Sequence, residues 1–259
     1  MKHALHLEIQ PQPNDSSCGP TCLAAVYAYW NDSVDIGQLI GETGGGNGAG
    51  TLAVQLGCHA LQRGYDTEIT TYNLHLFDPS WFDPTSGTAE ADRLSHKLRQ
   101  QLEAKRCRKD IDVKRFEVAT GYYLQYLRLG GRVRMQRLDD RLITKTLTAG
   151  VPILCGLSAT YLYQESRERP QPLDADGRSS VADDIAGDPV GHFVVLHGYD
   201  RVSGNVLIAD PLHPNPFAPT NNYLAPLSQV TSAILLGIVT YDANLLTLEP
   251  TASSKRILD

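Results

Sequence analysis

Cys18 begins a five-residue run that ends at Cys22, and it is the residue best placed for nucleophilic chemistry. A thiol becomes a strong nucleophile when its thiolate is stabilised, and the free N–H groups and dipole at the start of a helix provide that stabilisation. Apolar residues recur at helical spacing from Cys18 to Trp30, and Pro20 suits a first helical turn. The sequence therefore predicts Cys18 at a helix N-terminus, with Gly19 leaving the adjacent backbone open to a substrate.

A cysteine nucleophile needs a base, and His192 is the strongest candidate. His192 opens an apolar strand that runs to Leu196, and the next apolar run, 206–209, ends at Asp210. If these two strands pair as a hairpin, the start of the first lies beside the end of the second. We therefore expect Asp210 next to His192, where a carboxylate fixes the imidazole tautomer. Gly191 is expected to leave room around the ring.

Gln12 lies six residues before Cys18, so its amide is expected near the turn where an oxyanion forms. The amide and the backbone N–H of Cys18 would together bind that oxyanion. Each proposed role has a rival nearby in the sequence: Cys22 for the nucleophile, His197 for the base, Asp200 for the carboxylate and Gln10 for the amide.

The periodicity of apolar residues divides the chain into a helical first half and a second half rich in strands. Helices are predicted over 18–30, 35–42, 51–63, 89–107, 113–129, 139–149 and 225–235. Strands are predicted over 4–9, 66–73, 151–157, 192–199, 205–209 and 237–241, with a long polar flap over 164–189. This order predicts an α+β fold in which helices pack on an antiparallel sheet.

The composition of the 259-residue chain is that of a globular protein, with 42% hydrophobic and 20% charged residues. A net charge of −6 argues against a general nucleic-acid binder, which needs a basic surface. No apolar run reaches the length of about 18 residues that a membrane span needs, and the N-terminus lacks the apolar region of a signal peptide. We therefore expect a cytoplasmic protein with its five cysteines reduced. Neither a metal site nor a membrane contact is expected.

Four short motifs together resemble the C39-like peptidase family of the papain-like superfamily. They are Gln12-x5-Cys18-Gly19, the block Gly191 to Leu196, Gly198-Tyr199-Asp200 and Ala209-Asp210-Pro211. The resemblance implies Cys18 as nucleophile, His192 as base, Asp210 as orienting residue and Gln12 as oxyanion donor, with no cofactor. It also implies one papain-like domain over 1–259, with a helical part at about 18–130 and a sheet part at about 131–245.

C39 peptidases are best known for cleaving leader peptides after a double glycine while fused to an ATP-binding transporter. This sequence carries no transporter segment and no Walker A pattern, so a free-standing member is expected. The expected reaction is hydrolysis of a peptide or amide bond through a thioester. Two alternatives remain open: acyl transfer to an amine or thiol at the same triad, and a peptide-binding module without catalysis. The substrate and the oligomeric state are open as well.

Overall fold

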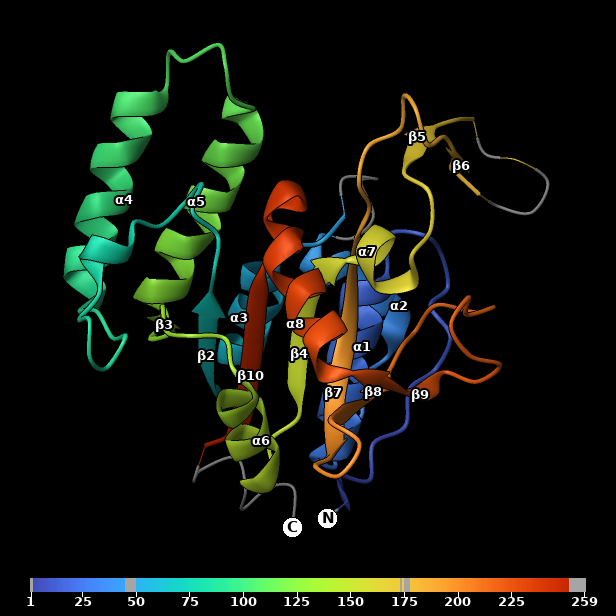
Figure 1. Ribbon diagram of the computed structural model, residues 1–259. Coiled ribbons are helices and arrows are strands. Elements are labelled where there is room, and N and C mark those ends of the chain that lie inside the picture. The colour runs from blue at the N-terminus through green and yellow to red at the C-terminus, as the bar shows by residue number, and fades with distance from the viewer. Residues whose placement is uncertain (1, 45–49, 173, 175–177, 252–259) are drawn as a thin grey trace.

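The computed structural model describes residues 2–44, 50–172, 174 and 178–251 and contains an eight-stranded sheet at its centre (Figure 1). Along the sheet the strands are β3 (Arg132–Arg134), β2 (Tyr65–Thr71), β10 (Asn244–Pro250), β4 (Ile153–Ser158), β7 (Gly191–Asp200), β8 (Asn205–Ala209) and β9 (Asn222–Pro226). β1 (Lys2–Ala4) pairs with the end of β7. β2 and β3 are parallel, and the other pairs named here are antiparallel.

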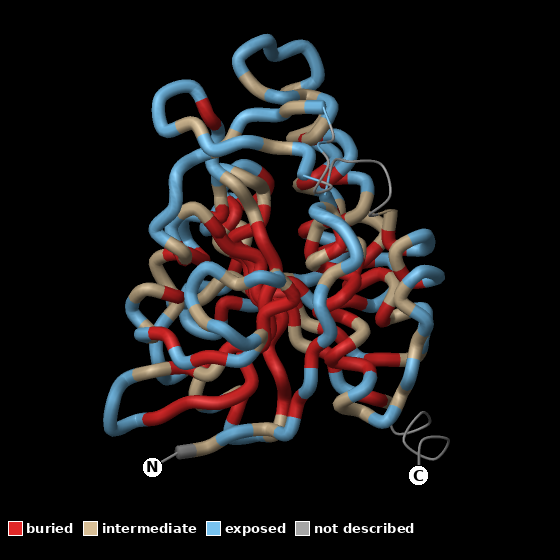
Figure 2. Tube along the Cα trace, turned by 90° about the vertical axis from the view of Figure 1, so that its right-hand side faces the viewer, coloured by how far each residue is buried: buried red, intermediate tan, exposed pale blue. Residues whose placement is uncertain are grey.

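Helices cover both faces of this sheet. The helices whose buried residues share one core with Phe193 and Val195 of β7 are α1 (Cys18–Tyr29), α2 (Ile36–Thr43), α3 (Ala53–Gln62), α4 (Ala91–Lys105) and α5 (Val113–Arg128). The helices that share the second core with Val194 and Leu196 are α6 (Asp140–Thr148), α7 (Ala159–Tyr163) and α8 (Leu227–Leu236). Alternate residues of a strand face opposite sides of a sheet, so β7 contributes to both cores. Figure 2 shows the buried residues concentrated in the central strands.

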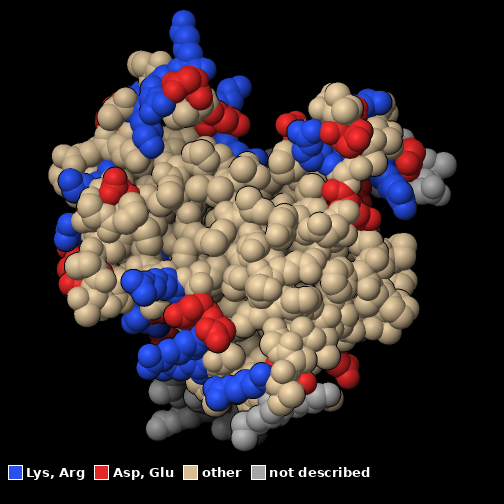
Figure 3. All heavy atoms as spheres, viewed as in Figure 1, with Lys and Arg blue, Asp and Glu red and all other residues tan. Residues whose placement is uncertain are grey.

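Two projections rise from one end of the sheet (Figure 1). One is the hairpin of α4 and α5, and the other is the flap that carries β5 (Glu168–Pro170) and β6 (Ser180–Ala182). Figure 3 shows charged side chains gathered on both projections, with a recess between them. α1 and β7 both begin at this end of the molecule. The remaining elements are the short 3-10 helices η1 (Pro79–Trp81) and η2 (Gly237–Thr240).

The start of α1 is held tightly against the sheet. A Cβ atom on Gly19 would lie 3.3 Å from the ring of Phe193 and 3.3 Å from Leu56. One turn further on, the Cys22 thiol donates to the carbonyl oxygen of Phe193 at 3.2 Å. Gly19 therefore does not leave the backbone open to a substrate, as the sequence predicts. Its missing side chain lets α1 approach β7.

The predicted α+β fold is confirmed by helices packed on a largely antiparallel sheet. The predicted strand over 237–241 is wrong, because this stretch forms the short 3-10 helix η2 and the last strand is β10. Tyr241 and Ala243 adopt positive φ angles of 64° and 29°, which break the chain direction before β10 begins. β2 also joins the sheet between β3 and β10, so the first part of the chain contributes a strand as well as helices.

Leu23 tests the packing that anchors α1, because its side chain is fully buried in the core on that face. Leu23→Ala leaves a cavity, so we expect the free energy of unfolding in urea to fall by about 2–5 kcal/mol. Leu235→Ala on α8, where the side chain is 47% exposed, is the matched control and should change it by less than about 1 kcal/mol. Equal losses in both variants would contradict the packing described here.

Candidate active site

His192 and Asp210 meet where β7 begins and β8 ends. β7 and β8 pair antiparallel with Val195 opposite Ala209, as the predicted hairpin requires. His192 Nε2 and Asp210 Oδ1 lie 2.9 Å apart. The histidine is 6% exposed and the aspartate is fully buried. The structure therefore brings together the two side chains that the sequence paired, in a setting shielded from water.

Burial and charge act in opposite directions on this pair. Burial lowers the pKa of His192, but the charge and hydrogen bond of Asp210, aided by Cys18, outweigh it and raise the pKa to about 10. Burial likewise raises the pKa of Asp210, yet the imidazolium and the hydrogen bonds that the carboxylate accepts hold the pKa below its ordinary value. Opposite charges in contact favour each other's ionised forms. The arrangement therefore favours a protonated His192 beside an ionised Asp210.

Cys18 is the first residue of α1, with Ser17 as its N-cap, and its side chain is half-buried. Its thiol interacts with His192. Because Nε2 of the ring is engaged by Asp210, the contact with Cys18 falls to Nδ1. The first helical donor is the N–H of Thr21, which bonds to Ser17 O at 3.0 Å. The N–H groups of Cys18 and Gly19 precede it and point out of the helix start.

Gln12 is tied to the segment that follows Asp210. Its backbone N–H donates to the carbonyl oxygen of Pro211 at 2.8 Å, and its side-chain Nε2 donates to Asn14 O at 3.0 Å. The amide oxygen Oε1 is buried, and no hydrogen-bond partner for it occurs among the described residues. Gln12 thus lies in the loop before Cys18, with one N–H of its amide committed to that loop and the second available.

The rival residues do not join this cluster. Cys22 is fully buried under β7, and burial raises the pKa of its thiol well above the ordinary value. His197 lies at the irregular point of β7 between Leu196 and Gly198, and its Nδ1 contacts Leu5 O at 3.0 Å. Asp200 is at the far end of β7 and accepts from the N–H of Val202. The structure therefore groups Cys18, His192 and Asp210, with Gln12 nearby.

Two tyrosines that the sequence did not single out also reach Asp210. The hydroxyls of Tyr163 and Tyr223 donate to Asp210 Oδ2 at 2.7 Å and 2.6 Å. Tyr163 ends α7, and Tyr223 lies in β9. Both elements are short, and the strand pairing that places β9 beside β8 is a long-range feature. No local pattern in the sequence indicates this contact.

A second buried carboxylate, Asp242, packs against Gly191, the residue before His192, and interacts with the charge of His192. Asp242 is 6% exposed and accepts a hydrogen bond from Thr240 Oγ1 at 2.9 Å. A Cβ atom on Gly191 would collide with Asp242 Oδ2, and it would lie 2.8 Å from Thr240 Oγ1. Gly191 therefore does not open space around the histidine, as the sequence suggested. It makes room for Asp242.

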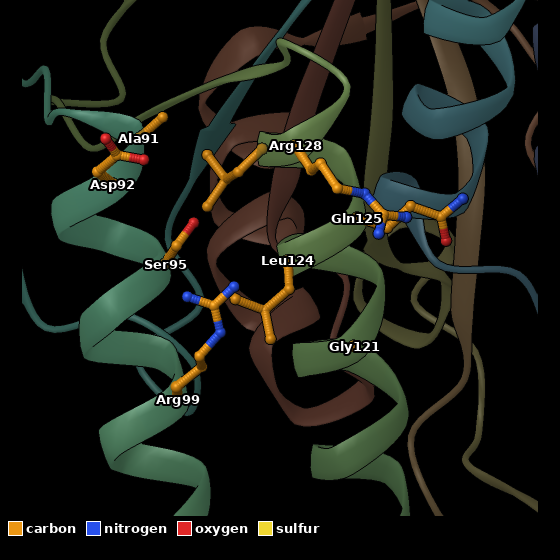
Figure 4. Close-up of a pocket in the computed structure, with 9 residues that line it drawn as sticks. Ala91, Asp92, Ser95, Arg99, Gly121, Leu124, Gln125 and Arg128 are labelled. Atoms are coloured by element: carbon orange, nitrogen blue, oxygen red, sulfur yellow. The ribbon is translucent and has the colours of Figure 1, made fainter.

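A pocket of about 550 Å³ lies away from this cluster, between α4 and α5 (Figure 4). The residues that line it are Ala91, Asp92, Ser95, Arg99, Gly121, Leu124, Gln125, Leu127 and Arg128. None of them belongs to the cluster around Cys18, so this pocket is not the candidate active site. Within the described ranges, no group of three His, Cys, Asp or Glu side chains could hold a metal ion. Among the same residues, no helix has both the length and the apolar character of a membrane span.

Comparison with solved structures finds peptidases. The chain is similar to the peptidase domain of ComA, a bifunctional ABC transporter of Streptococcus involved in a quorum-sensing pathway. The identity is 14% and the TM-score 0.44, with 95% of this chain and 100% of that domain covered. It is also similar to a protein from Bacillus anthracis described as a C39-like peptidase, at 15% identity and a TM-score of 0.40, covering 96% of this chain and 98% of that one.

No protein-family model matches the chain, and no curated protein matches it. With overall similarity at this level, the roles of individual residues rest on the geometry of the site itself.

Burial of Asp242 should make the folded protein less stable as the pH rises. Burial raises its pKa to about 7, against the opposing effects of Thr240, Arg115 and His192. An acid whose pKa is raised by folding holds its proton in the folded state while the unfolded chain releases it. Stability is therefore lost as the pH rises from about 4, near the unfolded pKa of an aspartate, to about 7, and the penalty is complete above pH 7.

Asp242→Asn should remove this penalty and retain an acceptor for Thr240. We expect the free energy of unfolding to rise by about 2–4 kcal/mol at pH 8 and by clearly less at pH 5. Thermal or urea unfolding of both proteins across this pH range measures the difference. A gain that is the same at both pH values would show that ionisation of Asp242 is not its cause.

Proposed function

We propose that the protein is a cysteine hydrolase that cleaves a peptide or amide bond, with Cys18 as nucleophile, His192 as base and Asp210 as the carboxylate that orients it. The observation that supports this most strongly is the buried His192–Asp210 pair, 2.9 Å apart, in contact with a cysteine at a helix N-terminus. A cysteine next to an imidazolium and a helix start meets the two conditions that activate a thiol.

In the proposed reaction, Cys18 Sγ attacks the carbonyl carbon of the substrate, and the C=O bond becomes a single bond to an oxyanion. The free N–H groups at the start of α1 and the second amide N–H of Gln12 would stabilise that oxyanion. His192 Nδ1 gives its proton to the leaving nitrogen as the C–N bond breaks, which leaves a thioester. His192 then takes a proton from water, whose oxygen attacks the thioester. The C–S bond then breaks and the acid is released, which restores the Cys18 thiolate beside the protonated His192.

The recess between the α4–α5 hairpin and the β5–β6 flap is the proposed approach for the substrate. α1 and β7 begin at this end of the molecule (Figures 1 and 3). The flap also touches the loop before the nucleophile, because the N–H and hydroxyl of Ser179 both donate to Asp15 Oδ2. We place the activity in the cytoplasm, since all five cysteines are free thiols and such thiols persist in reducing compartments.

The direct test is labelling with an electrophilic peptide amide probe, followed by mass spectrometry of the cysteine-containing peptides. We expect rapid labelling of Cys18 in the wild type, none in Cys18→Ala and undiminished labelling in Cys22→Ala. His192→Ala should slow labelling by about 100-fold or more, since general acid–base catalysis contributes about that much. Undiminished labelling in Cys18→Ala, or its loss only in Cys22→Ala, would overturn the assignment.

Cleavage of a peptide library by the wild type, with Cys18→Ala as control, then separates the possible reactions. New carboxyl termini indicate hydrolysis. Products that carry an added amine, formed only when that amine is supplied, indicate acyl transfer. A chain that binds peptides but yields neither product with wild-type Cys18 is a binding module, and the proposed function is then wrong.

A further inference from the structure

The carboxylate of Asp210 accepts four hydrogen bonds, two at each oxygen. Oδ1 receives His192 Nε2 at 2.9 Å and the N–H of Leu212 at 3.0 Å. Oδ2 receives the hydroxyls of Tyr163 at 2.7 Å and Tyr223 at 2.6 Å. A carboxylate offers about four lone-pair sites, so every site is used. Asp210 has no exposed surface, and these four donors therefore replace the water that an ionised carboxylate needs.

The two tyrosines serve as neutral donors. Burial, followed by the negative charge of Asp210, raises the pKa of both hydroxyls well above the ordinary value. Each hydroxyl therefore keeps its proton and can donate it to the carboxylate. Since both donate to Oδ2, they leave Oδ1 to His192 and to the backbone of Leu212.

The fold brings two separate elements, β9 and α7, to this carboxylate. Tyr223 in β9 is paired with Ile208 in β8, so it lies beside Asp210, two residues further on and on the same face. Tyr163 ends α7, which follows β4, the other neighbour of β7. Its ring centroid is also 6.0 Å from that of His192. Asp210 is thus held from both sides of the strand that carries the histidine.

We propose that Tyr163 and Tyr223 are positioning residues of this site: they fix the Asp210 carboxylate in the orientation that receives His192 Nε2–H and keep it ionised. The inference rests on the proposed function, because it assigns their role within the Cys18–His192–Asp210 arrangement. In this proposal the two tyrosines act through Asp210 and do not contact the substrate.

Removal of the two hydroxyls should change the protonation of Asp210 and His192 at low pH. The titratable groups that act on the Asp210 carboxylate are His192, Tyr163, Tyr223 and the Cys22 thiol. Without the two hydroxyls, a buried Asp210 accepts a proton more readily. His192 then loses the charge that favours its imidazolium. The reactive state, with His192 protonated and Asp210 ionised, is therefore reached only at a higher pH.

The alkaline side behaves differently. Loss of the His192 proton at high pH takes place while Asp210 is ionised, with or without the tyrosine hydroxyls. Removal of the two hydroxyls takes two donors from the carboxylate, so it does not weaken the interaction by which Asp210 keeps the His192 proton. The acid limb of Cys18 reactivity should therefore move to higher pH with no downward shift of the alkaline limb, a pattern that a general loss of structure does not produce.

The test is the pH dependence of Cys18 alkylation by iodoacetamide, followed on the Cys18 peptide by mass spectrometry. In the Tyr163→Phe/Tyr223→Phe double variant we expect the acid limb to move up by about one pH unit or more, because two charge-assisted hydrogen bonds are lost. At a pH on that limb, alkylation should slow by about tenfold. Each single variant should show a smaller shift in the same direction.

Matched controls exist for both tyrosines. Tyr199→Phe removes the hydroxyl of a tyrosine as buried as Tyr223, whose partner is Thr148 Oγ1 at 3.0 Å. Tyr161→Phe changes an exposed residue on the same helix as Tyr163. Both controls should keep the wild-type profile, and thermal unfolding should show that all variants are folded.

An acid limb in the double variant equal to that of the wild type, or a slower rate at every pH without a shift, would overturn the inference. If a single variant alone folds, its acid limb decides in the same way. If wild type and His192→Ala share one profile, the proposed function itself fails, and the inference fails with it. If instead the profile changes in His192→Ala but not in the tyrosine variants, the proposed function stands and only the inference about the tyrosines fails.

Discussion

The buried contact between His192 and Asp210 is the interaction on which the rest of the site depends. A fully buried carboxylate without a counter-charge would take up a proton, and a buried histidine without one would lose its proton. At a separation of 2.9 Å, the Asp210 carboxylate favours the protonated form of His192, and the imidazolium favours the ionised form of Asp210. β7 and β8 place the pair, and the tight approach of α1 to β7 at Gly19 brings Cys18 to it. Packing of the sheet against α1 is thus what turns three distant residues into one site.

Two buried carboxylates near the same histidine have opposite protonation preferences. Asp210 accepts hydrogen bonds at both oxygens and faces the imidazolium, which lowers its pKa. Asp242 has the Thr240 hydroxyl as a hydrogen-bond donor, and burial raises its pKa to about 7. The contrast follows from the number of donors and the distance to positive charge. It separates a carboxylate that can sustain an imidazolium from one that stays largely protonated below neutral pH.

What the sequence predicted correctly depends on local patterns. The helix that begins at Cys18 follows from apolar periodicity, and the His192–Asp210 contact follows from two short apolar strands separated by a turn. The partners of Asp210 could not be predicted, because Tyr223 reaches it through the pairing of β8 with β9. The sequence predicts openings at Gly19 and Gly191, whereas the space beside them is filled by Phe193 and Asp242. The sequence shows that a glycine lacks a side chain, but not which neighbouring group occupies the space.

The protonation state of His192 shows whether Asp210 sustains an imidazolium in this site. Nitrogen NMR of the histidine ring, compared between the wild type and Asp210→Asn at pH 8, distinguishes imidazolium from neutral imidazole. We expect both ring nitrogens to be protonated in the wild type, since Asp210 raises the pKa of His192 to about 10, and the ring to be neutral in the variant. A wild-type ring that is already neutral at pH 8, titrating near about 6.5 as an unperturbed histidine does, would contradict this expectation.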